Sequence, residues 1–177
     1  MFSHKTLFLD RDGIINIDHG YTYQIDSFTF VSGIFDLISL FQSKGYQIFI
    51  VTNQSGIGRG YYTLHDFEKL TEWMIKTFDQ EGISIKKVFY CPHKPEDHCS
   101  CRKPKTGMIE QALEEFDINL EHSWMIGDKQ SDIDLADNGH IANSIAIGND
   151  SIQNATLHFK TIQECLEYLQ ENQGKIY

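Results

Sequence analysis

Two pairs of acidic residues have the spacing of a metal-binding and acid–base site. Asp10 and Asp12 follow an apolar run, and Gly13 allows the chain to turn directly after them. Asp128 and Asp132 follow another apolar run and lie one helical turn apart at the start of a predicted helix. Neighbouring carboxylates repel one another unless a cation lies between them, and hard oxygen ligands suit Mg²⁺. Taken alone, the first pair could be a surface turn and the second pair could cap a helix.

A segment rich in polar groups and glycine, Thr52 to Gly60, follows a third apolar run. Its hydroxyl, amide and backbone N–H groups, together with Arg59, suit an anion such as a phosphate. A flexible glycine-rich turn is the alternative. The segment lacks the Gly-x-Gly-x-x-Gly pattern because Tyr61 occupies the third glycine position, and the chain has no P-loop motif. Dinucleotide binding and P-loop chemistry are therefore poor fits.

Thiol and imidazole side chains cluster within eleven residues, at Cys91, His93, Cys99 and Cys101. Three sulfurs and one imidazole nitrogen complete a tetrahedron, which is typical of structural Zn²⁺ because no position stays open for water. Unligated thiols, or His98 in place of His93, are the alternatives. Arg102 and Lys103 follow the last ligand directly, so bound zinc would fix where these two cations point.

Strands and helices alternate along the chain and must position these clusters. Apolar runs rich in β-branched and aromatic residues predict strands at 6–9, 47–51, 87–90, 123–126 and 144–147. Apolar stripes of helical period lie between them, at Ile34, Leu37, Ile38 and Phe41, at Leu64, Phe67, Leu70, Met74 and Phe78, and at Met108, Ile109, Ala112, Leu113 and Phe116. Thr161 and Glu164 predict the start of a last helix, in which Cys165 is expected to be buried.

This alternation predicts an α/β fold, a doubly wound, three-layer, Rossmann-like parallel sheet in a single domain over residues 1–177. All four polar clusters follow strands, so they should meet at the carboxyl edge of the sheet, where such folds bind ligands. The short segment between Asp12 and the second strand leaves room for a flap around 21–30 and one helix, but for no cap domain. His19, Tyr21 and Tyr23 could close over a ligand, and simple packing of the flap is an equal alternative.

Composition excludes several classes of function. The chain has 177 residues and a formal net charge of −10, which argues against sequence-independent binding of nucleic acid. No apolar run is long enough to span a bilayer, and the N-terminus does not resemble a signal peptide. We therefore expect a cytoplasmic monomer, without a membrane or nucleic-acid partner, that acts on a small phosphorylated molecule.

In this order the residues resemble the four motifs of the haloacid dehalogenase superfamily of phosphotransferases. The resemblance implies that Asp10 is a nucleophile that takes the phosphoryl group, while Asp12 protonates the leaving alcohol and later activates water. It also implies that Thr52 binds phosphoryl oxygens and that Lys103 neutralises their charge. The implied magnesium ligands are Asp10, the Asp12 carbonyl oxygen and Asp128, with Asp132 as an indirect partner.

Within the superfamily, the cysteine loop joined to Cys-Arg-Lys-Pro is similar to two branches, the heptose bisphosphate phosphatases and the histidinol-phosphate phosphatases. The segment from Thr52 to Gly60 and the pair Gly107-Met108 are similar to the heptose branch, whereas the histidinol branch usually has Asp at position 55. Gly58 and Thr106 depart from the heptose pattern, in loops that bear on fine specificity.

A sugar bisphosphate has a second dianion, which Arg59 or Arg102 could bind, whereas the amine of histidinol phosphate would need a carboxylate that Ser55 does not offer. The predicted substrate contacts are Asn53, Gln54, Ser55, Arg59, Arg102 and Lys129. A polynucleotide 3′-phosphatase and a catalytically silent zinc-loop interaction module are the competing hypotheses.

Overall fold

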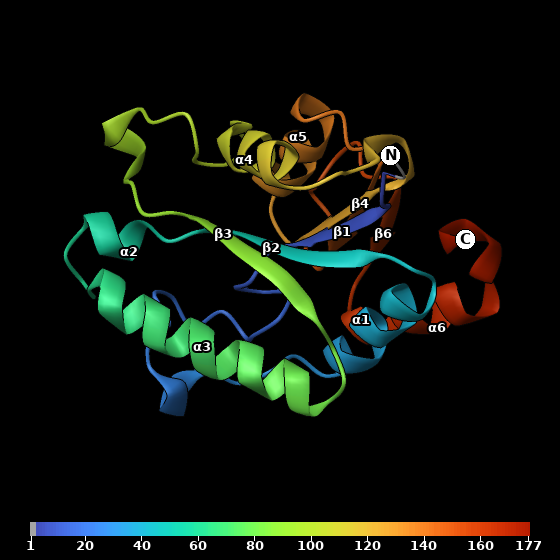
Figure 1. Ribbon diagram of the computed structural model, residues 1–177, viewed down its shortest axis with the longest axis horizontal. Coiled ribbons are helices and arrows are strands. Elements are labelled where there is room, and N and C mark those ends of the chain that lie inside the picture. Colours follow the sequence, from blue (N-terminus) through green and yellow to red (C-terminus); the bar gives the residue numbers. More distant parts are fainter. Residues whose placement is uncertain (1–2) are drawn as a thin grey trace.

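The computed structural model describes residues 3–177, which form one parallel sheet with helices on both faces (Figure 1). The strand order is β3-β2-β1-β4-β5-β6, and every neighbouring pair is parallel. The strands are β1 (Thr6–Leu9), β2 (Gln47–Asn53), β3 (Ile85–Cys91), β4 (Trp124–Gly127), β5 (Asn143–Ile147) and β6 (Leu157–Phe159).

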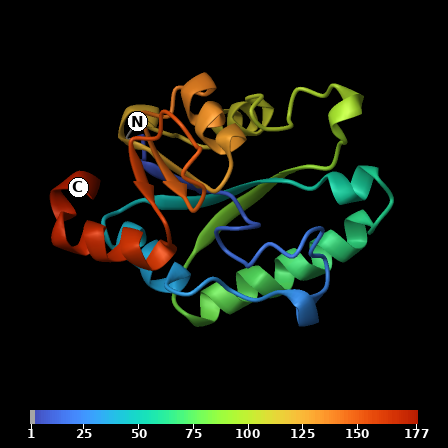
Figure 2. The same ribbon diagram turned by 180° about the vertical axis from the view of Figure 1, so that it is seen from behind.

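Helices cover the sheet in two layers. On one face lie α1 (Ile34–Ser43), α3 (Leu64–Gln80) and α6 (Ile162–Glu171), and on the other lie α4 (Gly107–Glu115) and α5 (Gln130–Asn138) (Figures 1 and 2). The shorter elements are α2 (Ser55–Gly58) and the 3₁₀ helices η1 (Ile25–Ser27), η2 (Pro95–Asp97), η3 (Leu120–His122) and η4 (Gln173–Ile176). None of the helices in residues 3–177 is long and apolar enough to cross a membrane.

The buried strands divide their side chains between two cores because successive residues of a strand point to opposite faces. In β1, Leu7 and Leu9 join the core beneath α1, α3 and α6, whereas Phe8 joins the core beneath α4 and α5. In β2, Ile48 and Phe49 divide in the same way. This alternation confirms the predicted three-layer α/β architecture.

The topology places the start of the chain at the centre of the sheet. β1 pairs with β2 on one side and with β4 on the other, so the strand order reverses at β1. In open α/β sheets, ligands bind in the crevice at such a reversal, outside the carboxyl ends of the strands. The residues after β1, β2 and β4 are therefore brought to one place.

The structure confirms the five predicted strands, with shifted ends, and corrects some details. β6 was not predicted because it has only three residues and its central His158 is exposed, so no apolar run marks it. Leu64 and Leu113, expected in the core, are 41% and 42% exposed, because each lies at the edge of its helix's apolar stripe. Cys165 is buried, as expected.

Candidate active site

A cavity of about 380 Å³ opens at the carboxyl ends of the central strands. Its walls come from the flap after β1, from the end of β2, and from the segments that follow the cysteine loop and β4. The lining residues are Asp12, Asp18, Gly20, Tyr21, Asn53, Gln54, Ser55, Tyr62, Arg102, Lys103, Lys129 and Ser131. The structure thus brings most of the predicted site residues around one space.

Three carboxylates and a lysine meet next to this cavity. Carboxylate oxygens of Asp10, Asp128 and Asp132 lie within 4.8 Å of one another. The Nζ atom of Lys103 lies 2.8 Å from Asp10 Oδ1 and 2.7 Å from Asp132 Oδ1, and it donates a hydrogen bond of 2.9 Å to the Val51 carbonyl. Both Lys103 and Asp10 are 5% exposed, so their charges interact with little screening by water. Three of the four carboxylates in the two predicted acidic pairs therefore converge in the structure, and Asp12 does not join them.

The charges in this cluster do not balance. Burial, together with the negative charge of Asp132, raises the pKa of Asp10 to about 8, although Lys103 opposes the shift. Burial also raises the pKa of Asp128. Burial alone would lower the pKa of Lys103, but Asp10 and Asp132 raise it above its ordinary value, so the lysine remains charged. When all three carboxylates are ionised, they leave excess negative charge around one buried ammonium, and a divalent cation would offset it.

Asp128 is the carboxylate that is best placed to bind such a cation. Among the described residues the Oδ1 atoms of both Asp128 and Asp132 are buried without a hydrogen-bond partner. Asp132 Oδ1 lies 2.7 Å from Lys103 Nζ, however, whereas Asp128 Oδ1 lies 3.7 Å from Lys129 Nζ. Asp132 Oδ2 also accepts a hydrogen bond of 3.1 Å from the backbone N–H of Lys129. Gly13, at φ +94°, makes room for Asp128, because a Cβ atom there would lie 2.0 Å from Asp128 Oδ2. Asp132 contacts Lys103 instead, in keeping with its predicted indirect role.

The raised pKa of Asp10 predicts that the affinity for Mg²⁺ rises with pH. The folded, metal-free protein binds a proton at Asp10 up to about pH 8, whereas the unfolded chain releases it near 3.8. The contribution of Asp10 to folding stability therefore falls as the pH rises from about 4 to about 8. Because Mg²⁺ needs the ionised carboxylate, its apparent affinity should increase by roughly tenfold per pH unit below that pKa. Calorimetric titration at pH 6, 7 and 8 measures this slope, and equal affinities at all three values would contradict it.

Asp12 lies outside the carboxylate cluster and faces the cavity. Its Oδ1 atom accepts hydrogen bonds from Arg11 Nη2 at 2.8 Å and from Asn16 Nδ2 at 3.0 Å, and its Oδ2 atom accepts one from Gln54 Nε2 at 3.1 Å. Arg11 is 1% exposed and also donates to the Thr22 carbonyl. Arg11 and Asn16 were not predicted as site residues. The signal for Arg11 was an arginine between two candidate catalytic carboxylates.

The side-chain amides at the end of β2 form hydrogen bonds with other residues of the site. Thr52 Oγ1 accepts a hydrogen bond of 2.8 Å from Gln54 Nε2, and both residues are buried. Asn53 Oδ1 accepts a hydrogen bond of 3.0 Å from the backbone N–H of Lys103. The side chains of Asn53 and Gln54 are thus bound within the protein, and their predicted contact with substrate stays a prediction. Ser55, the first residue of α2, lines the cavity.

The predicted cationic contacts differ in their placement. Arg102 and Lys129 line the cavity, whereas Arg59, just past α2, is not among the lining residues. Within residues 3–177, Arg102 Nη1 and Arg59 Nε are buried without hydrogen-bond partners. Both guanidinium groups therefore have donor capacity to spare for an anionic ligand.

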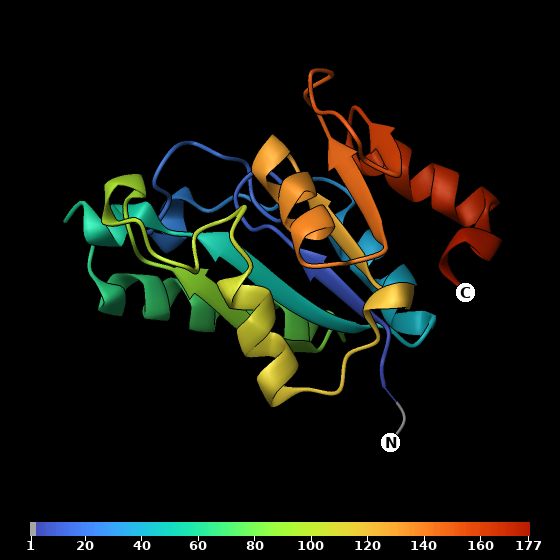
Figure 3. The ribbon, with the colours of Figure 1, turned by 90° about the horizontal axis from the view of Figure 1, so that it is seen from above.

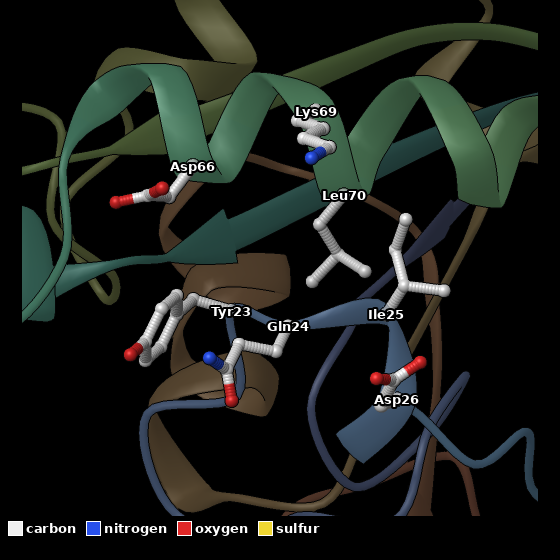
Figure 4. Close-up of a pocket in the computed structure, with 7 residues that line it drawn as sticks. All are labelled: Tyr23, Gln24, Ile25, Asp26, Asp66, Lys69 and Leu70. Carbon is white, nitrogen blue, oxygen red and sulfur yellow. The ribbon is translucent and has the colours of Figure 1, made fainter.

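The flap aromatics divide between the two predicted roles. Tyr21 lines the cavity and makes an edge-on contact with Tyr61, with ring centroids 4.8 Å apart. Tyr23 stacks on Tyr62 at 5.2 Å and lines a neighbouring hollow between the flap and α3, together with residues such as Asp66 and Leu70 (Figure 4). Packing of the flap accounts for Tyr23, and contact of Tyr21 with a substrate stays a prediction.

The cysteine loop brings its four predicted ligands together. The Sγ atom of Cys101 lies 3.1 Å from Cys91 Sγ, 3.6 Å from Cys99 Sγ and 3.3 Å from His93 Nδ1. Ligand atoms about 2.3 Å from a tetrahedral Zn²⁺ lie roughly 3.8 Å apart, which is close to these separations. His93 belongs to the cluster, and His98 does not. The donor set and its spacing fit a tetrahedral Zn²⁺ ion.

The thiol groups of this cluster lie in unlike environments. Burial raises the pKa of the Cys91 thiol above its ordinary value. Burial also acts to raise the pKa of Cys99, but hydrogen bonds from the backbone of Arg102 and from neighbouring thiols lower it to about 6. Metal ligation requires thiolates, and a bound cation would stabilise all of them together.

The cysteine loop also supports the catalytic edge of the sheet. The Cys91 carbonyl accepts a hydrogen bond of 2.7 Å from the backbone N–H of Gln54, and the Pro92 carbonyl accepts one of 2.8 Å from Gly58. Lys103 lies two residues beyond the last thiol. The loop and α2 lie side by side in Figure 3. An ion that orders the cysteine loop would therefore also help to fix the positions of Gln54 and Lys103.

Removing metal from the cysteine loop should lower stability and activity together. A loop with few apolar residues has little burial to offset an ordering cost of roughly 1–2 kcal/mol per residue. A chelator of high zinc affinity should therefore lower the melting temperature and turnover, and added Zn²⁺ should restore both when Mg²⁺ is kept in excess. Thermal melts and assays measure this. Unchanged melting and turnover after verified loss of zinc would contradict it.

The fold and the site together define the class of protein. A parallel sheet with an aspartate pair after its central strand, Thr52 near the end of the next strand, Lys103 on a loop and a second acidic pair after β4 has the architecture of haloacid dehalogenase-like hydrolases. The family model described as HAD-hydrolase-like matches residues 100–165.

Relatives with high sequence similarity narrow this class. The chain is 43% identical over 170 residues to the D-glycero-beta-D-manno-heptose-1,7-bisphosphate 7-phosphatase of Helicobacter pylori strain J99, with coverage of 94% of this chain and 98% of the relative. It is 44% identical over 168 residues to the D-glycero-alpha-D-manno-heptose-1,7-bisphosphate 7-phosphatase of Campylobacter jejuni, with coverage of 94% and 96%. The chain belongs to the heptose-1,7-bisphosphate 7-phosphatase family of the haloacid dehalogenase superfamily.

A solved structure shares the fold over almost the whole chain. The D,D-heptose 1,7-bisphosphate phosphatase of B. bronchiseptica, crystallised with magnesium and phosphate, superposes with a TM-score of 0.84 at 24% identity and covers 95% of this chain and 99% of its own. The predicted fold without a cap domain therefore has a close structural counterpart.

Proposed function

We propose that this protein removes the 7-phosphate of D-glycero-D-manno-heptose 1,7-bisphosphate and releases heptose 1-phosphate. The product would enter the synthesis of nucleotide-activated heptose for lipopolysaccharide, capsule or S-layer glycan. The observation that carries the proposal is the position of Asp10 against Lys103, which lines the same cavity as Asp12. The names of relatives at 43% and 44% identity over nearly the whole chain support the choice of substrate.

The proposed reaction uses the two carboxylates that follow β1, those of Asp10 and Asp12. A carboxylate oxygen of Asp10 attacks phosphorus, and Asp12 gives its proton to the leaving oxygen as the P–O bond of the sugar ester breaks. The Asp12 carboxylate then takes a proton from water, which attacks the aspartyl phosphate and releases inorganic phosphate with Asp10 restored. Thr52 Oγ1 accepts its hydrogen bond from Gln54, so its own proton can be donated to a phosphoryl oxygen.

Two metals complete the proposed site. Mg²⁺ held by Asp10, the Asp12 carbonyl oxygen and Asp128 would offset the charge of the phosphoryl oxygens. Zn²⁺ would be structural, held by Cys91, His93, Cys99 and Cys101. The excess negative charge around Lys103 supports the first metal, and the spacing of the four donors supports the second.

The cations around the cavity are suited to bind the second phosphate group of a sugar bisphosphate. Arg102, whose buried Nη1 atom has no hydrogen-bond partner among the described residues, and Lys129 both line the cavity, where they would bind a second phosphate that the catalytic carboxylates would repel. Ser55 at the rim offers a hydroxyl and no carboxylate, which disfavours the cationic amine of histidinol phosphate. A cytoplasmic location, a monomeric state and the absence of nucleic-acid partners stay predictions from the sequence.

A comparison of substrates tests this proposal. The values of kcat/KM should be measured for both anomers of the heptose bisphosphate, because the two relatives are named for opposite anomers. Fructose 1,6-bisphosphate, histidinol phosphate and a 3′-phosphorylated oligonucleotide serve as comparisons. We expect one heptose anomer to exceed all three by at least about tenfold. An equal or higher value for histidinol phosphate or the oligonucleotide would overturn the proposed substrate.

A further inference from the structure

A buried hydrogen-bond chain leads from Tyr62 to the proposed acid–base residue. The hydroxyl group of Tyr62 donates to Gln54 Oε1 at 2.5 Å, and Gln54 Nε2 donates to Asp12 Oδ2 at 3.1 Å and to Thr52 Oγ1 at 2.8 Å. Tyr62 is 5% exposed and Gln54 is 2% exposed. Each polar atom of the Gln54 amide is therefore bound to another protein side chain.

When Asp12 is ionised, the hydrogen bonds of this chain favour one orientation of the Gln54 amide. If the amide turned over, its oxygen would face the Asp12 carboxylate, and two hydrogen-bond acceptors would meet without a proton between them. The Tyr62 hydroxyl, as a donor, holds the amide oxygen on the opposite side. Tyr62 thereby keeps the N–H₂ group of Gln54 directed at Asp12 and Thr52.

The ring of Tyr62 is itself fixed from two sides. A Cβ atom at position 56 would lie 2.1 Å from Tyr62 Cε1, so Gly56 provides the space that the ring occupies. Tyr23 of the flap stacks on the other part of the ring, with an interplanar angle of 10°. Tyr62 thus packs against the flap and α2 and is hydrogen-bonded to Gln54 at the end of β2.

We propose that Tyr62 is a positioning residue that acts through Gln54 to aim the Asp12 carboxyl group at the leaving oxygen. The inference rests on the proposed role of Asp12. It also gives Gln54 a different role from the substrate contact that the sequence suggests, because both N–H groups of its amide are already donated within the protein. The two roles make different predictions for substrates that do not need an acid.

Removing the Tyr62 hydroxyl should lower kcat/KM most for substrates whose leaving group must be protonated as it departs. An alkoxide leaving group must be protonated as it departs, whereas p-nitrophenolate leaves without a proton. For Tyr62→Phe we expect kcat/KM to fall about tenfold with a sugar phosphate, the size expected for one buried hydrogen bond, and to change by less than about twofold with p-nitrophenyl phosphate. Equal losses on both substrates, or none, would overturn the proposal.

A double-mutant cycle separates positioning from general damage. If Tyr62 acts only through Gln54, Tyr62→Phe should cause no further loss of kcat/KM in a Gln54→Leu background, whereas independent roles would give additive losses. Tyr46→Phe is the matched control, because Tyr46 is also 5% exposed but directly precedes β2, at the opposite end of that strand from Thr52. For this control we expect only a small loss of kcat/KM, of the same size on both substrates.

The two proposals fail in distinguishable ways. If the wild-type protein prefers another alkyl phosphate, the proposed substrate is wrong, and the comparison of alkyl with aryl esters is made on the preferred ester. If the substrate is right but the leaving group makes no difference to the Tyr62→Phe variant, the role of Tyr62 is wrong and the proposed function stands.

Discussion

Replacing Asp10 with Asn should abolish turnover and leave the fold intact. An amide cannot form the aspartyl phosphate, so we expect kcat to fall by at least about 10⁴-fold. The substitution is nearly isosteric, and an amide oxygen can still accept the hydrogen bonds that Lys103 Nζ and the Arg11 backbone now donate to Oδ1. The loss of activity should therefore not reflect unfolding.

Stability and chemical trapping complete this test. Without Mg²⁺, the amide of the Asp10→Asn variant adds no charge to the cluster, so near pH 8 the variant should melt no lower than the wild-type protein, whose Asp10 ionises there at a cost. Acid quenching during turnover of a labelled phosphate ester should trap phosphorylated wild-type protein and no phosphorylated variant. Asp79→Asn, an exposed acid near the end of α3, is the control. Residual turnover within about tenfold of wild type would show that Asp10 is not the nucleophile.

The sequence is sufficient to predict where the site lies, because the relevant physics is local. Short apolar runs mark the strands, and polar clusters directly after those runs must meet at one edge of a parallel sheet. Asp10 and Asp128 are brought together in this way, although they are far apart in the chain. The cysteine loop was predictable for a simpler reason, since its donors are close in sequence and can reach one ion without help from the rest of the fold.

The contacts that orient the catalytic groups were not predictable. Arg11 contacts Asp12 with a side chain that is buried in the core, and Lys103, just after the cysteine loop, contacts Asp132 of α5. Such contacts depend on side-chain rotamers and on the register between distant elements, which no local pattern encodes. Gln54 shows the consequence: the sequence places it at the site, but only its three bonded partners show that its amide is already used.

Buried polar and charged groups gather at this site because they stabilise one another. Removing charged groups from water costs free energy that must be offset by hydrogen bonds or opposite charges. Arg11 lies against Asp12, and Lys103 lies between Asp10 and Asp132, so both of these buried cations have carboxylate partners. Among residues 3–177, the one cation paired with Asp128 is the exposed ammonium of Lys129, 3.7 Å away, so Asp128 has the weakest ion pair in the cluster. A weakly paired carboxylate oxygen is free to bind a metal ion.

Replacing Lys103 with Met should damage both stability and activity. The substitution keeps an unbranched side chain of similar shape but leaves Asp10 and Asp132 buried without their cation, a change that typically costs about 3–5 kcal/mol. It also removes the charge that faces the transferring phosphoryl group, so we expect kcat to fall by about 10²–10³-fold. Denaturant unfolding and steady-state kinetics measure the two effects separately.

The pH dependence and a surface control distinguish this result from a general packing defect. The loss of stability should be larger at pH 8 than at pH 5, because at the lower pH Asp10, with its pKa raised to about 8, is already protonated and needs no cation. Saturating Mg²⁺ should reduce the loss, since the ion supplies part of the missing positive charge. Lys87→Met, which breaks an exposed ion pair with Glu115, should cost no more than about 1 kcal/mol. A loss of stability for Lys103→Met that is equally small, or that does not change with pH, would contradict the assignment of Lys103 as the counter-ion of the catalytic carboxylates.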